Sequence, residues 1–165
     1  MGWASFMQGS RTMQSSTQDL STAGRISTIE LRPALGPVLP RRLLLAEDDG
    51  PFRYLLTSAL RKDGYQIVAV SNGVDLMDIL GDSLSADGTL ASFDLVLSDL
   101  HMPGWPGLDG LAKVGRNPSM PPFILFTAFG DDDTHNRARA IGALTLLNKP
   151  FDVDYLRELV AQVLC

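Results

Sequence analysis

Polar residues of a few kinds follow short apolar runs along the chain. Glu47, Asp48 and Asp49 come directly after Leu43–Ala46. Carboxylates this close repel one another and raise each other's pKa unless a positive charge lies among them. Later apolar runs are followed by three further polar side chains, Asp99, Thr127 and Lys149. The acidic stretch is therefore expected to be half of a binding site.

These residue types suit phosphoryl transfer. Converging carboxylates form a hard-oxygen site for Mg²⁺, which usually binds one or two protein carboxylates together with a phosphate. The ammonium group of Lys149 would neutralise phosphoryl oxygens, and the hydroxyl of Thr127 would donate one hydrogen bond. Asp99 is the best-placed nucleophile because an aspartate can form an acyl phosphate. The sequence therefore predicts Mg²⁺ as the cofactor of a phosphoryl-transfer site.

Each residue alone has a simpler explanation. Asp99 would start a turn, Thr127 would cap a helix and Lys149 would lie on the surface. Asp49 would assist the N-terminus of the following helix. Only the joint placement at the ends of apolar runs favours a site. Other catalytic arrangements find less support, because the chain has only two histidines and no GxxxxGK[ST] phosphate loop.

The runs that precede these positions predict five buried strands. Short stretches rich in Leu, Val, Ile and Phe, bounded by polar residues, are typical of strands covered on both faces. The predicted strands are Leu43–Ala46, Gln66–Val70, Asp94–Ser98, Phe123–Phe126 and Leu144–Leu147.

Helical patterns follow the first two strands. A short second helix is predicted after the capping candidates Ser71 and Asn72, and residues 81–92 are predicted to be a polar loop. Pro51 suits the first turn of the first helix. The apolar stripe of that helix has the spacing i, i+3, i+4, i+7, i+8 and consists of Phe52, Leu55, Leu56, Ala59 and Leu60.

Three more helices complete an alternating pattern. Two weaker ones are predicted over Leu108–Gly115 and Asp131–Ile141, and the last begins after the N-cap Asp152. Five strands, each followed by a helix, predict an α/β fold with a five-stranded parallel sheet and helices on both faces. In such sheets, ligands bind beyond the carboxyl ends of the strands. The stripe of the last helix consists of Val153, Leu156, Val160 and Val163.

Length and charge limit the class of protein. The 165 residues suffice for one well-buried domain, and the formal net charge of -5 disfavours direct binding to nucleic acid. The single cysteine, Cys165, excludes an intramolecular disulfide, which fits a cytoplasmic location. No run reaches the roughly 18 apolar residues of a membrane helix. A soluble protein without membrane contact is expected.

Residues 1–40 differ from the rest in composition. They are rich in Ser, Thr, Gln and Gly and end in three spaced prolines, without a sustained hydrophobic period. This composition predicts a flexible N-terminal tail or linker, and the first ten residues are equally consistent with a cloning remnant. The folded domain is expected to occupy residues 41–165.

Four motifs in this domain resemble the receiver domain of two-component response regulators. In chain order they are LLLAEDD, LVLSDLHMPG, FILFTA and LNKPF. The resemblance covers residues 41–165 and none of residues 1–40. It implies the flavodoxin-like (βα)5 receiver fold and a phosphoprotein that carries an aspartyl phosphate.

The resemblance implies a role for the acidic residues. Asp99 is similar to the phosphoacceptor, which takes a phosphoryl group from a histidine kinase or a histidine phosphotransfer protein. Glu47 and Asp48 resemble the acidic pair that holds Mg²⁺ together with the acceptor. The backbone carbonyl of His101 is implied as a further metal ligand. His101 and Phe129 also occupy positions that influence the lifetime of the phosphoryl group in this family.

The resemblance also covers the switching residues. Thr127 is similar to the hydroxyl that turns toward the phosphoryl group, and Lys149 to the lysine that contacts it. The Lys149–Pro150 bond resembles one that is cis in this family. Leu146 departs from the pattern, since many receivers carry Tyr or Phe three residues before the lysine. Switching coupled to that aromatic residue is therefore in question.

The function implied is a switch in a phosphorelay and not a turnover enzyme. Phosphorylation would shift the population of a partner-binding face formed by the fourth helix, the fifth strand and the last helix; homodimer formation is left open. One alternative is a constitutive interaction module of the same fold that is not phosphorylated. It is considered because Leu146 occupies the position at which many receivers carry Tyr or Phe. Another is a Mg²⁺-dependent phosphatase of the haloacid dehalogenase type. Those enzymes carry a DxD motif, whose second Asp lies two residues after the nucleophile. In this chain, His101 occupies the position of that second Asp.

Overall fold

The computed structural model describes residues 39–85, 93–105, 107–114 and 120–165. The predicted tail over residues 1–40 therefore lies outside the described residues except for Leu39 and Pro40, which are exposed and belong to no strand or helix. Most of the predicted loop over residues 81–92 also lies outside them. Both interpretations stay predictions for those segments.

Five parallel strands form one sheet in the order β2-β1-β3-β4-β5. This is the flavodoxin-like order, in which strand order reverses between β1 and β3. All five strands that the sequence predicts are present, with ends within one residue of the prediction, and the predicted fold class is confirmed. The strands are β1 (Arg42–Ala46), β2 (Gln66–Val70), β3 (Leu95–Asp99), β4 (Phe123–Thr127) and β5 (Thr145–Asn148).

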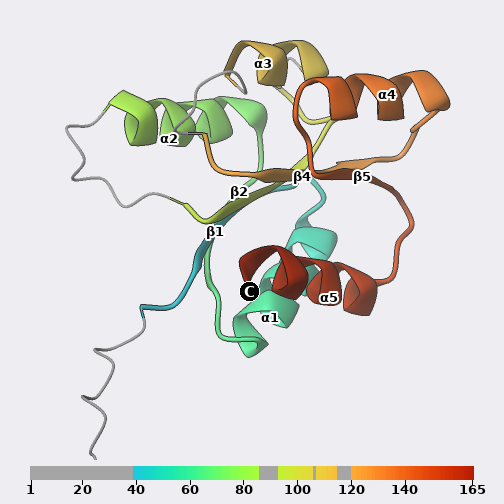
Figure 1. Ribbon diagram of the computed structural model, residues 1–165. Helices are drawn as coiled ribbons and strands as arrows, with labels where there is room; N and C mark the ends of the chain where they lie inside the picture. The colour runs from blue at the N-terminus through green and yellow to red at the C-terminus, as the bar shows by residue number, and fades with distance from the viewer. Residues whose placement is uncertain (1–38, 86–92, 106, 115–119) are drawn as a thin grey trace, which may run out of the picture. The chain divides into compact units, whose positions relative to one another are not determined.

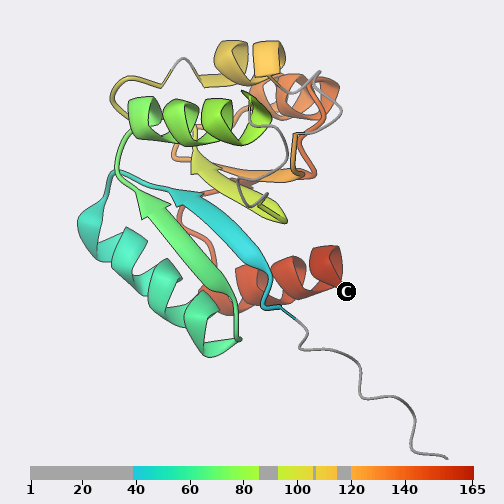
Figure 2. The same ribbon diagram turned by 90° about the vertical axis from the view of Figure 1, so that its left-hand side faces the viewer.

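Helices cover both faces of the sheet, as the right-handed crossovers of parallel strands require. Figures 1 and 2 show α1 and α5 on one face and α2, α3 and α4 on the other. Among the described residues, no helix is both long and apolar enough to cross a membrane. The helices are α1 (Gly50–Lys62), α2 (Gly73–Ser85), α3 (Gly107–Val114), α4 (Asp132–Ala140) and α5 (Val153–Leu164).

The sheet separates two hydrophobic cores. Successive side chains of a strand point to opposite faces, so Leu43 and Leu45 of β1 pack against α1 and α5, whereas Leu44 packs on the other side. All residues of β3 and β4 are buried. The central strands are therefore held rigidly from both sides, and their last residues have well-defined positions at the carboxyl edge of the sheet.

Side-chain caps fix where several helices begin. Asp49 accepts a hydrogen bond from the backbone N–H of Phe52 at 2.7 Å, which caps α1. Asp152 caps α5 through the N–H of Asp154 at 2.8 Å, as predicted. Asn72, one of the two predicted candidates, accepts from the N–H of Asp75 at 2.9 Å. Each cap satisfies a backbone donor that the first helical turn leaves free.

Two predictions about the helices are wrong. Helix α2 continues to Ser85 and does not give way to a loop at Gly81. A single glycine inside a helix costs only about 1 kcal/mol relative to alanine, so Gly81 did not have to end it. In α1, Leu55 is 49% exposed and Thr57 is buried in its stead. Adjacent residues lie 100° apart around a helix, and an apolar stripe read from spacing is therefore easily one residue too wide.

Candidate functional site

Strand ends bring the candidate residues to one edge of the sheet. Asp99 is the last residue of β3 and Thr127 the last of β4. β1 ends one residue before Glu47, and Ala46 pairs with Ser98 in the neighbouring strand. These registers put residues from distant parts of the sequence side by side, as the sequence predicts.

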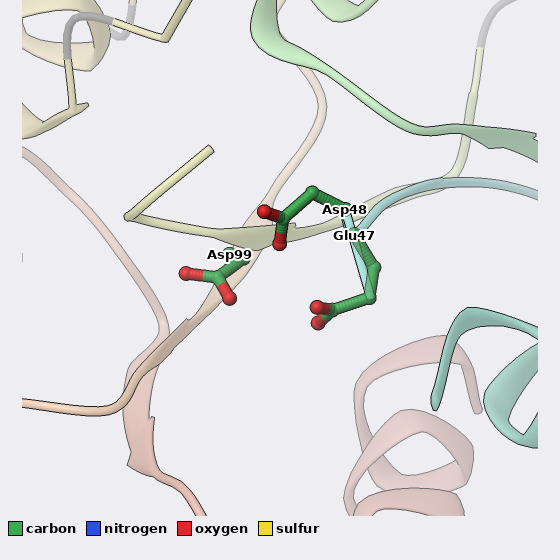
Figure 3. Close-up of side chains that lie close together, drawn as sticks. All are labelled: Glu47, Asp48 and Asp99. Carbon is green, nitrogen blue, oxygen red and sulfur yellow. The ribbon is translucent and has the colours of Figure 1, made fainter. Parts of the chain in front are cut away.

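Three carboxylates converge there. One oxygen from each of Glu47, Asp48 and Asp99 lies within 4.8 Å of the others, and Figure 3 shows the three side chains facing a common space. Glu47 and Asp99 are buried, whereas Asp48 is exposed. Asp49 is not part of this cluster because its carboxylate caps α1. Carboxylate oxygens in this arrangement fit a hard cation such as Mg²⁺.

Lys149 lies between two of the carboxylates. Its ammonium group donates hydrogen bonds to both oxygens of Glu47, at 2.8 and 2.7 Å, and to Oδ2 of Asp99 at 2.5 Å. The same nitrogen lies 5.0 Å from the centre of the Phe52 ring, within the range of a cation–π interaction. The Lys149–Pro150 bond that follows is cis, which confirms the prediction. One cation is therefore shared between two buried acids.

Burial and pairing shift the pKa values of this pair. Burial raises the pKa of the Glu47 carboxyl above its ordinary value, and the hydrogen bonds from Lys149 offset only part of that effect. Burial acts to lower the pKa of Lys149, but the hydrogen bonds to Asp99 and Glu47 outweigh it and the pKa of the ammonium group is raised. Lys149 therefore keeps its charge at neutral pH.

Arg53 is a neighbour of the site that sequence reasoning missed. Its Nη1 donates to the backbone oxygen of Glu47 at 2.6 Å and to that of Asp48 at 3.2 Å. These bonds hold the turn between β1 and α1, and they bring a second positive charge near the acidic residues. A basic residue in the first turn of α1, one turn after the acidic stretch, was the available signal.

The loop after Asp99 is packed against the start of α2. Gly73 donates its backbone N–H to the oxygen of Pro103 at 2.9 Å. A Cβ atom on Gly73 would lie 2.4 Å from Cα of Trp105, closer than real Cβ atoms come to other atoms. Glycine at this position therefore allows the loop after Asp99 to lie directly on α2.

Thr127 lies at the same edge of the sheet, but among the described residues its hydroxyl is not hydrogen-bonded to Asp99. Its buried hydroxyl accepts the backbone N–H of Phe129 at 3.1 Å and lies 3.4 Å from Nδ1 of His101. The backbone N–H of His101 donates to Oδ1 of Asp99 at 2.7 Å. The assignment of the His101 carbonyl as a metal ligand stays a prediction. Leu146 is buried in the core on the α2 side of the sheet.

Comparisons with known proteins agree with this geometry. The family model of the response regulator receiver domain matches residues 43–161. The chain is 32% identical over 127 residues to the sporulation initiation phosphotransferase F of Bacillus subtilis, covering 77% of this chain and 96% of that protein. It is 34% identical over 119 residues to the transcriptional regulatory protein PdtaR of Mycobacterium tuberculosis, covering 72% of this chain but only 54% of PdtaR.

A solved structure supports the same assignment. The signal receiver domain of a putative LuxO repressor protein from Vibrio parahaemolyticus superimposes with a TM-score of 0.66 at 28% identity, over 76% of this chain and 91% of that one. The family model, the relatives and the five-stranded fold agree over the same residues. The chain therefore belongs to the family of response regulator receiver domains.

Proposed function

We propose that this receiver domain is a phosphoacceptor switch of a two-component phosphorelay, with Asp99 as the acceptor. The donor is the phosphohistidine of a histidine kinase or a histidine phosphotransfer protein, met in the cytoplasm. The observation that carries the proposal is the pair of buried acids joined by Lys149, with the exposed Asp48 beside them. A buried aspartate next to a fixed cation is poised for attack on an anionic substrate.

Phosphoryl transfer at this site would exchange one bond to phosphorus for another. A carboxylate oxygen of Asp99 attacks the phosphorus atom, so that an O–P bond forms as the P–N bond to the donor imidazole breaks. The electron pair of the broken bond stays on the imidazole nitrogen, which takes up a proton. Lys149 is placed to neutralise charge on the phosphoryl oxygens. Thr127 can donate its hydroxyl proton to one of them once the hydroxyl has turned.

Mg²⁺ fits the donor set of the site. Glu47, Asp48 and Asp99 would hold it, together with the backbone carbonyl of His101, and the exposed Asp48 is the carboxylate most available for direct coordination. When bound, the ion would offset the negative charge of the incoming phosphoryl group, which three carboxylates would otherwise repel.

The output is proposed to pass through the face formed by α4, β5 and α5. Thr127 ends β4, next to β5, and the loop that follows it leads into α4. Movement of Thr127 toward a phosphoryl group would thus bias the position of α4 and the binding of a downstream protein or a second copy of the chain. The acidic domain is not expected to bind nucleic acid directly.

The test is the intact mass after incubation with acetyl phosphate. The expected result is one added phosphoryl group that requires Mg²⁺, disappears in Asp99→Asn and persists in the control Asp63→Asn. Asp63 is a suitable control because it lies just beyond the far end of α1 and pairs with Arg157. A folded protein that gains no mass under any condition would point to a constitutive interaction module. Continuous release of phosphate over many turnovers would point to a phosphatase.

A further inference from the structure

The hydroxyl of Thr127 is engaged away from the acceptor. It accepts the N–H of Phe129, which leaves its own proton free to be donated. Nδ1 of His101 lies 3.4 Å from this hydroxyl oxygen, and it is an acceptor for the proton when the imidazole carries its own hydrogen on Nε2. Within the described part of the chain, the hydroxyl is hydrogen-bonded to neither Asp99 nor Lys149.

Two contacts position His101 at the carboxyl edge of the sheet. Its backbone N–H is bound to Asp99, and its ring meets the ring of Phe129 edge-on, with the centroids 6.1 Å apart and the planes at 88°. Such an arrangement is favourable for two aromatic rings. The imidazole thus links the loop after β3 to the loop after β4, directly beside Thr127.

A hydroxyl has one proton, and this makes its two roles exclusive. Thr127 can donate to the imidazole of His101 or to a phosphoryl oxygen on Asp99, but it cannot donate to both. Resting on the proposed function, we propose that His101, as the tautomer with its hydrogen on Nε2, is a positioning residue that restrains Thr127 in the unphosphorylated state. Phosphorylation must then break the contact between the His101 imidazole and the Thr127 hydroxyl before the threonine can turn.

The structure leaves room for this release. A cavity of about 230 Å³ lies beside His101 and Phe129, between α3 and α4, and Leu108 and Arg137 contribute to its walls. Phe129 is 80% exposed, so its ring can move without opening a void in the core. The imidazole can therefore follow Phe129 into this space when the hydroxyl turns.

The test compares variants of His101 that can or cannot accept a hydrogen bond from the Thr127 hydroxyl. His101→Phe keeps an aromatic ring against Phe129 but cannot accept a hydrogen bond. It is expected to raise the initial rate of phosphorylation by acetyl phosphate about two- to fivefold, the effect of losing one weak hydrogen bond. His101→Asn, which offers an amide oxygen, is expected to return the rate toward that of the parent. His135→Ala, the change of the other histidine, should leave the rate unchanged.

A double-mutant cycle shows whether the effect acts through Thr127. In a Thr127→Val background, His101→Phe is expected to have no effect on the rate of phosphorylation. An equal acceleration in both backgrounds would overturn the proposal, because His101 would then act by admitting water or donor and not by holding the hydroxyl.

A second measurement needs no phosphorylation. In the ¹⁵N spectrum of the imidazoles, Thr127→Val should shift the Nδ1 signal of His101 and leave the signals of His135 in place. An unchanged His101 signal would overturn the restraint even if Asp99 is phosphorylated. A parent protein that takes up no phosphoryl group would instead overturn the proposed function of Asp99, and the spectrum distinguishes that failure from the failure of the restraint.

Discussion

Two regions of the domain have the same charges but a different environment. At the carboxyl edge of the sheet, Lys149 bridges Glu47 and Asp99, with side chains that are 21%, 0% and 7% exposed. At the other end of α1, Arg157 of α5 bridges Asp63 and Asp154, with side chains that are 38%, 25% and 76% exposed. We call the second arrangement the Arg157 clasp.

The two groups of one basic and two acidic residues differ in how far they are buried, and therefore in what they can do. The Arg157 clasp joins α5 to the end of α1 with two hydrogen bonds to Asp63, at 2.8 and 2.6 Å, but water can replace either partner at modest cost. At the Lys149 site, water cannot easily reach Glu47, and each charge depends on the others. The same charges therefore form a structural contact at the surface and, in a buried position, the site proposed for phosphoryl transfer.

The largest difference in stability between the two regions is expected when the basic residue of each is replaced. Lys149→Met leaves Glu47 and Asp99 buried without their cation, and we expect it to lower the free energy of unfolding by about 3 kcal/mol. Arg157→Met leaves its carboxylates accessible to water and should cost less than about a third as much. Urea unfolding of both variants at pH 7 measures the ratio. Equal losses would show that the burial of the Lys149 site has no energetic consequence.

Binding of Mg²⁺ should also distinguish the two regions. A cation at one hundred times its dissociation constant stabilises the folded state by about 2.7 kcal/mol. We expect thermal unfolding to show such a stabilisation in the parent and in Asp154→Asn, but little of it in Asp48→Asn. A loss of the effect in Asp154→Asn, with Asp48→Asn unaffected, would place the cation at the clasp.

Much of the fold followed from the sequence because burial leaves a periodic signal. The strands are uninterrupted apolar runs bounded by polar residues, and their ends were predicted to within one residue. Caps such as Asp152 were found for a related reason, since a side-chain oxygen just before a helix satisfies a free backbone donor. The exposure of Leu55 in α1 was not predictable, because the neighbouring strands and helix α5 decide which part of a wide apolar stripe is buried.

The site was predictable in its membership but not in its contacts. The chain has few polar residues at strand ends, and the topology of a parallel sheet forces them together. The partners of each side chain depend on three-dimensional packing, and Lys149 meets Glu47 across 102 residues of sequence. The Arg157 clasp was missed altogether, because exposed charges occur in many sequences without a pairing pattern.

A rise in pH should change the contributions of Glu47 and Asp63 to the free energy of unfolding in opposite directions. The pKa of Glu47 is raised, so its contribution to stability is complete below its ordinary value of 4.5 and decreases as pH rises through the higher folded value. The pKa of Asp63 is lowered, chiefly by the hydrogen bond from Arg157, so its contribution is present above 3.8 and is lost as pH falls through the lower folded value.

Two charge-removing variants measure these slopes. The stability of the parent minus that of Glu47→Gln should fall as pH rises above 4.5, whereas the stability of the parent minus that of Asp63→Asn should rise with pH below 3.8. Urea unfolding across pH 3 to 7 gives both differences. Slopes of the same sign would contradict the distinction between a buried and an exposed carboxylate.

Salt should produce the smallest effect, and it should act on one region only. At 1 M salt the Debye length is about 3 Å, which screens exposed charges strongly and buried charges much less. The loss of stability caused by Arg157→Met should therefore shrink by about half or more between low salt and 1 M NaCl, while the loss caused by Lys149→Met should change little. Sodium chloride also strengthens apolar burial slightly, but that effect is common to both variants and cancels in the comparison. If the two losses shrank together, water and ions would reach Glu47 as readily as Asp63, and the burial of Glu47 would not protect its ion pair with Lys149 from screening.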